Sequence, residues 1–159
     1  MKNISNPNEL QRIDSLYENI SNLIDKARES ASKTITTTEV YCKYGIGKFI
    51  IENELNGKYR GSYGKKILKI LSSKLTDKFG NGWSVESLTL CRKFYSVYSK
   101  IVNAVYEIGD SLNNNPTIPN FNLSWSHYLI LMRIENHEER HFYEIETFNQ
   151  NWSVRQLQR

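Results

Sequence analysis

Residues 64–99 decide the fold, and they read GKKILKILSSKLTDKFGNGWSVESLTLCRKFYSVYS. Apolar residues recur every three or four positions on both sides of a glycine-rich segment at 80–82. This spacing is typical of amphipathic α-helices, and the glycine-rich segment is typical of a turn. Ser84 is a favourable N-cap for the second helix, with Glu86 in its first turn. The stretch therefore predicts two helices joined by a short turn, a helix-turn-helix-like pair.

Positive charge is concentrated in and around this pair. The chain of 159 residues has a formal net charge of +4, yet residues 58–100 hold ten Lys or Arg against two Asp or Glu, a net of +8. A local basic block is expected of a polyanion binder, although a solvated lysine-rich helix face has the same composition. Phosphate contacts are expected from five lysines, Lys65, Lys66, Lys69, Lys74 and Lys78. Groove contacts are expected from Arg92 and Lys93 in the second helix of the pair. Arg155 is expected to play a similar part in a second helix-turn-helix-like unit near the C-terminus.

The N-terminal half also predicts helices. Residues 8–32 carry one apolar stripe at helical spacing, which needs a partner helix from the same chain or from a second copy in a homodimer. The β-branched run at 35–38 predicts a junction before a second helix, which begins near Thr38 and ends at Asn56-Gly57. Gly45 and Gly47 in that helix suggest close helix packing, because the spacing of a nucleotide-binding glycine loop is incomplete.

The C-terminal part predicts a separate group of short helices. Residues 110–122 contain three consecutive asparagines and two prolines, so they predict a loop between an N-terminal helical region, 1–109, and a three-helix unit, 123–159. Ser124, Asn136 and Ser153 are the expected N-caps, and the unit offers a second helix-turn-helix-like pair over about 124–159. Its last helix reaches the end of the sequence within two turns, which suggests truncation. The expected fold is mainly α, a multi-helix domain.

Several classes of protein are excluded. A composition of 39% hydrophobic and 24% charged residues suits a soluble globular chain. No run of 18 apolar residues exists to span a membrane, and the N-terminus lacks the apolar segment of a signal peptide. The two cysteines, Cys42 and Cys91, are too few for a disulfide scaffold. A reducing cytoplasm is the expected location.

Catalytic patterns are weak. Residues 137–141 read HEERH, a literal match to the zinc-peptidase pattern, but the charged middle and the lack of a further ligand favour a solvated first helical turn. None of the 17 acids has a lysine two residues later, as a PD-(D/E)xK nuclease site requires. Cys91 falls on an apolar helix face and is interpreted as a core residue. We therefore expect no catalytic residue, metal or cofactor, and no enzyme activity in this chain.

The tryptophans mark helix starts. Trp83, Trp125 and Trp152 each lie at or beside the first residue of a predicted helix. They are interpreted as residues that fix the entry of a helix into the core, with base stacking as the alternative.

An ordered set of motifs resembles a known family. The motifs that carry the main likeness are Tyr44–Lys48, Tyr63–Lys66, Leu71–Leu75, Phe79–Ser84, Leu123–His127 and Asn151–Leu157. Over residues 20–159 the chain is similar to the N-terminal region of YhcG-type proteins, a domain of unknown function that usually precedes a PD-(D/E)xK nuclease-like domain. The resemblance implies a module that accompanies a nuclease domain in a longer protein, and it supplies no catalytic residue. The tail from Leu123 is also similar to the helix-turn-helix of ParB-type partition proteins.

Two functions follow as hypotheses. The first is a non-catalytic nucleic-acid-binding module, with duplex DNA favoured over RNA. The second is a protein-interaction or oligomerisation domain, supported by the striped helix 8–32 and by an acidic patch that would repel phosphates. The patch comprises Glu135, Glu138, Glu139, Glu144 and Glu146.

Overall fold

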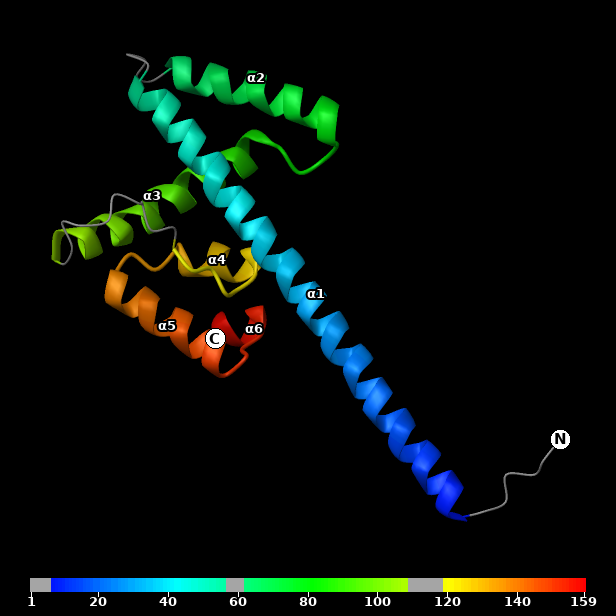
Figure 1. Ribbon diagram of the computed structural model, residues 1–159. Helices are drawn as coiled ribbons and strands as arrows, with labels where there is room; N and C mark the ends of the chain where they lie inside the picture. Colours follow the sequence, from blue (N-terminus) through cyan, green and yellow to red (C-terminus); the bar gives the residue numbers. More distant parts are fainter. Residues whose placement is uncertain (1–6, 57–61, 109–118) are drawn as a thin grey trace. The chain divides into compact units, whose positions relative to one another are not determined.

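A computed structural model describes residues 7–56, 62–108 and 119–159 (Figure 1). The described residues form helices and no strands, which confirms the prediction of a mainly α fold. The chain divides into two units, Met1–Thr36 and Thr37–Arg159. Most of the predicted loop 110–122 lies outside the described residues. The helices are α1 (Pro7–Asn56), α2 (Ser62–Phe79), α3 (Val85–Ile108), α4 (Trp125–Leu131), α5 (His137–Asn149) and α6 (Val154–Leu157).

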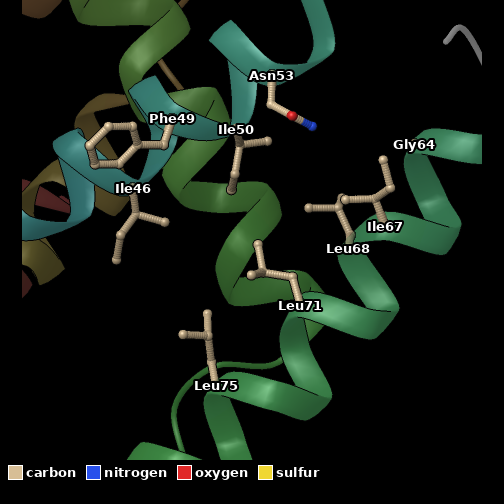
Figure 2. Close-up of a pocket in the computed structure, with 9 residues that line it drawn as sticks. All are labelled: Ile46, Phe49, Ile50, Asn53, Gly64, Ile67, Leu68, Leu71 and Leu75. Carbon is tan, nitrogen blue, oxygen red and sulfur yellow. The ribbon is translucent and has the colours of Figure 1, made fainter. Parts of the chain in front are cut away.

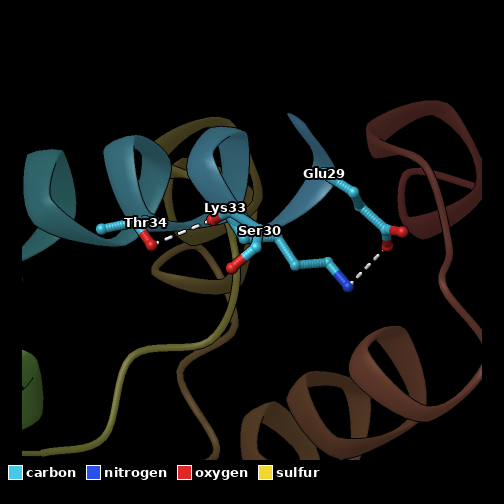
Figure 3. A network of polar contacts seen from close by, with 4 residues as sticks. All are labelled: Glu29, Ser30, Lys33 and Thr34. Atoms are coloured by element: carbon cyan, nitrogen blue, oxygen red, sulfur yellow. Dashed lines mark hydrogen bonds and ion pairs between the residues drawn. The ribbon is translucent and has the colours of Figure 1, made fainter. Parts of the chain in front are cut away.

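Helix α1 is continuous, so the predicted junction at 35–38 and a separate helix beginning near Thr38 are wrong. The hydroxyl of Thr34 donates to the carbonyl of Ser30 at 2.9 Å (Figure 3), and that of Thr36, within the run, donates to the carbonyl of Ser32 at 2.9 Å. Threonine fits a helix when its hydroxyl bonds the carbonyl four residues earlier. Lys33 also pairs with Glu29 at 2.8 Å across one helical turn, which lowers the pKa of Glu29. The predicted end of this helix at Asn56 is confirmed.

The first unit carries an exposed apolar stripe on α1. Leu16, Tyr17, Ile20, Leu23 and Ile24 are 45–68% exposed. Their spacing is that of one helix face, as the sequence predicted. The stripe is therefore an unpartnered apolar surface of this unit.

The core of the second unit is aromatic. Phe94 of α3 is fully buried, and its ring lies 6.0 Å from that of Tyr44 in α1 and 5.2 Å from that of Tyr128 in α4. Phe121 and Leu123, just before α4, are also buried in this cluster. Edge-to-face and tilted ring pairs of this kind stabilise a core beyond their burial alone. The cluster joins α1, α3 and α4 into one packed body.

A second apolar cluster joins α1, α2 and α3. Ile50, Leu68 and Leu88, one from each helix, are buried together, with Trp83 packed against them. Gly47 allows α1 to approach α3, because a Cβ at this position would overlap the backbone carbonyl of Cys91. The prediction of close packing is confirmed for Gly47. It is wrong for Gly45, where a Cβ would have no neighbour within 4 Å.

A half-buried carboxylate, that of Glu144, connects α5 to α3 and α4. The hydroxyl of Tyr128 donates to Glu144 Oε1 at 3.0 Å, and that of Tyr98 approaches Oε2 at 3.5 Å. Burial raises the pKa of Glu144 above its ordinary value of 4.5, although the tyrosine hydrogen bonds act in the opposite direction. Burial also raises the pKa of both tyrosines, so their hydroxyls stay protonated as donors. The ionised form of Glu144 therefore lowers the free energy of unfolding, whereas the protonated form does not.

We expect this cost to depend on pH. Since folding raises the pKa of Glu144, its penalty is present above the raised value and disappears as the pH falls through that value toward 4.5. The substitution Glu144→Gln keeps an acceptor oxygen for the tyrosine hydroxyls but removes the negative charge. The free energy of unfolding of the wild type, relative to this variant, should rise as the pH is lowered from neutral toward 4.5, in urea titrations followed by circular dichroism. A difference that stays constant or falls over this range would contradict the assignment.

The C-terminal helices begin at the predicted caps. Asn136 accepts a hydrogen bond from the backbone of Glu139 at 3.0 Å, and Ser153 forms a full capping box with Gln156. Ser124 precedes α4, but its hydroxyl bonds His127 Nδ1 at 2.7 Å in place of a helix amide. His127 Nε2 lies 3.0 Å from the carbonyl of Trp152. His127 thus ties the start of α4 to the turn before α6, and it has no ring nitrogen left for another partner.

Candidate nucleic-acid interface

The predicted turn between α2 and α3 is confirmed. Gly80 and Gly82 have φ of +82° and +110°, which glycine adopts without steric cost. The amide of Gly80 donates to the carbonyl of Thr76 at 2.9 Å and closes the last turn of α2. Ser84 then caps α3, because its Oγ accepts from the amide of Ser87 at 3.2 Å. Local sequence thus fixes where α2 ends and where α3 begins.

Helix α2 turns its apolar face toward α1. Ile67, Leu68, Leu71 and Leu75 face Ile46, Phe49 and Ile50 of α1 across an apolar cavity of about 360 Å³ (Figure 2). Asn53 and Gly64 complete its lining. Because this face is committed to α1, the remaining faces of α2 carry the charge.

All five predicted lysines of α2 are exposed, namely Lys65, Lys66, Lys69, Lys74 and Lys78. Helical periodicity places Lys65 and Lys69 on one flank of the apolar face, and Lys74 and Lys78 on the other. Asp77 is the one acid of α2. The helix therefore presents a basic surface that extends around its solvent side.

Helix α3 contributes two further cations. Lys93 is exposed, whereas Arg92 is half-buried. Both follow the buried Cys91 by one or two positions, which places them away from the centre of the apolar face. The structure therefore brings Arg92, Lys93 and the lysines of α2 into one pair of packed helices.

Arg155 lies apart from this pair. It is exposed on α6, and α2 and α6 lie at opposite ends of the second unit in Figure 1. The sequence predicted Arg155 for the second helix-turn-helix-like pair, beyond the loop at 110–122. Its part in binding remains a prediction for that separate surface.

The acidic patch is smaller than the sequence suggested. Glu135, Glu138 and Glu139 are exposed at the start of α5 and just before it. Glu144 and Glu146 are half-buried, and the carboxylate of Glu144 is engaged by the tyrosine hydroxyls described above. The patch therefore lies at the start of α5, away from α2 (Figure 1).

Aromatic rings and cations meet at the turn between α2 and α3. Lys43 Nζ lies 4.5 Å from the ring centroid of Trp83 and 5.9 Å from that of Trp125. Trp83 also packs against the second apolar cluster, which supports its interpretation as a residue that fixes helix entry. Sequence reasoning missed Lys43 as a partner of both tryptophans, because the three residues are far apart in the chain.

The motifs that suggested catalysis do not form a site among the described residues. His137 and His141 are exposed with ring centroids 6.2 Å apart, and no cluster of three or more possible metal ligands occurs in the described part of the chain. Burial raises the pKa of the Cys91 thiol to about 11, which suits a core residue. No helix in the described ranges is both long and apolar enough to cross a membrane.

Comparison with known proteins identifies relatives of the chain. The family described as DUF1016 N-terminal domain matches residues 19–159. A protein of Escherichia coli (strain K12) named "Putative nuclease YhcG" is 28% identical over 161 residues, which cover 91% of this chain and 43% of that protein. The chain thus spans less than half the length of this relative. No solved structure matches it significantly.

Proposed function

The chain belongs to the DUF1016 N-terminal domain family, and from that premise we propose that it is a nucleic-acid-binding module whose ligand is duplex DNA. The observation that carries the proposal is the exposed basic surface of α2, next to the glycine turn that leads into α3. A relative named as a nuclease supports it, because such a protein must hold nucleic acid. In this proposal the lysines of α2 bind phosphates.

Helix α3 is the element proposed to approach the bases. Lys93 and Arg92 lie on the helix that follows the turn, the position of the groove-reading helix in a helix-turn-helix pair. The major groove of B-form DNA admits an α-helix, whereas that of A-form RNA is too deep and narrow. This difference favours DNA over RNA as the ligand.

The proposed role is binding without catalysis. Of the candidates that the sequence offered, Cys91 is buried in the core, and His137 and His141 have no third possible metal ligand near them among the described residues. We assign cleavage, where the longer proteins of the family perform it, to a nuclease-like domain that the module would bring to its substrate.

Fluorescence anisotropy of the full chain tests the ligand class. Labelled duplexes of about 20 base pairs, one of DNA and one of RNA with the same sequence, are titrated at about 50 mM salt. Tighter binding to the DNA duplex is expected. Equal affinity for the two duplexes would contradict groove insertion by α3, and the absence of binding to either would refute the proposal.

The exposed stripe of α1 favours one second candidate, self-association. Leu16 and Leu23, like Tyr17 and Ile24, are seven residues apart, which is the repeat of a coiled coil. Light scattering should then give a multiple of the 18.6 kDa chain mass, reduced to one chain mass in Ile20→Asp/Leu23→Asp. A single-chain mass for the wild type at every concentration would exclude this role.

A further inference from the structure

Phe79 is an exposed aromatic residue at the end of α2. It is 59% exposed, although it is the last residue of a helix whose other large apolar residues mostly face α1. Its ring lies 6.4 Å from that of Trp83 in an edge-on arrangement. Burial in the core therefore does not account for the presence of a phenyl ring here.

The surroundings of Phe79 are cationic and open. Lys78 Nζ lies 5.1 Å from the centroid of its ring, and the Lys78 side chain is exposed. A Cβ built at Gly80 or Gly82 would meet no atom within 4 Å, so the adjoining turn leaves space for a ligand. An exposed ring that pairs with one tryptophan and lies beside a lysine suits a ligand that combines a π-face with phosphate better than an apolar protein surface, which requires a wider patch.

We propose that Phe79 is a stacking platform for an unpaired base, and that Lys78 holds the adjoining phosphate. The inference rests on the proposed function and narrows its substrate class to DNA that has a single-stranded segment beside a duplex. Stacking on an aromatic side chain is tolerant of base identity, because every base has a π-face. The site therefore selects for the structure of the DNA and not for its sequence.

The test compares two DNA probes by anisotropy at about 100 mM salt. One is a blunt duplex of about 20 base pairs, and the other is the same duplex with a 3′ tail of about ten thymidines. The tail should tighten binding by the wild type about 10-fold beyond the blunt duplex. Phe79→Tyr should keep this gain because it keeps the ring, whereas Phe79→Ala should lose it and retain its affinity for the blunt duplex.

Phe148→Ala is the matched control, since Phe148 is a similarly exposed aromatic residue, at 53%, on α5. It should bind both probes as the wild type does. Circular dichroism establishes that each variant is folded. A wild type that binds the blunt duplex without gain from the tail, or a Phe79→Ala variant that keeps the gain, would overturn the inference. Binding to neither probe would refute the proposed function, and this inference with it.

Discussion

Replacing Lys69 and Lys74 by glutamate is expected to weaken binding of a DNA duplex on the order of 100-fold at about 50 mM salt. The two lysines lie on opposite flanks of α2, so the double variant disturbs both sides of the basic surface. Each substitution removes one phosphate contact and places a carboxylate where it repels the DNA backbone. The dissociation constant, measured by anisotropy, checks the expectation.

The matched control is Lys26→Glu/Arg28→Glu. Both residues are exposed on α1 in the first unit, and their substitution changes the net charge by the same amount. This variant should lose much less affinity, through the weaker long-range field alone. Equal losses in the two variants would show that binding follows overall charge, and would contradict a localised interface on α2.

Gly47→Ala is expected to lower the free energy of unfolding by about 3 kcal/mol. A Cβ at this position would overlap the carbonyl of Cys91 and lie 2.8 Å from the Cβ of Tyr95. Backbone atoms of α3 cannot turn aside as a side chain can, so α1 and α3 would have to separate. Urea unfolding followed by tryptophan fluorescence measures the change.

Gly45→Ala provides the matched control with the opposite sign. It makes the same chemical change two residues earlier in α1, where a Cβ meets nothing within 4 Å. The variant should gain roughly 1 kcal/mol, because alanine has a higher helix propensity than glycine. Destabilisation by both substitutions would contradict the close approach of α1 and α3 at Gly47.

The helix ends and turns that short stretches of sequence determine were predictable. The turn at 80–82, the cap at Ser84 and the end of α1 at Asn56 depend on residues next to one another in the chain. The run at 35–38 misled the prediction because β-branched residues favour strands on average. Hydroxyl bonds to preceding carbonyls, as Thr34 makes, reconcile such threonines with a helix. The burial of Phe121 depends on long-range packing that no local pattern encodes.

The candidate interface was predictable in part. Helical periodicity alone placed the lysines of α2 off its apolar face, and their exposure confirms that placement. Whether Arg155 joins them depends on the arrangement of α2 and α6, and the burial of Glu144 depends on tyrosines from two other helices. The exposure of Phe79 could not be predicted either, because its position in the apolar period of α2 predicted burial.

The central claim, that the basic surface of α2 binds the phosphates of duplex DNA, is tested most directly by a salt series. The logarithm of the association constant should fall linearly with the logarithm of salt concentration, with a slope of roughly −3 to −5 for the wild type. In Lys69→Glu/Lys74→Glu the slope should be shallower by about 2, one phosphate contact for each lysine. No binding at about 50 mM salt, or the same slope in both proteins, would contradict the claim.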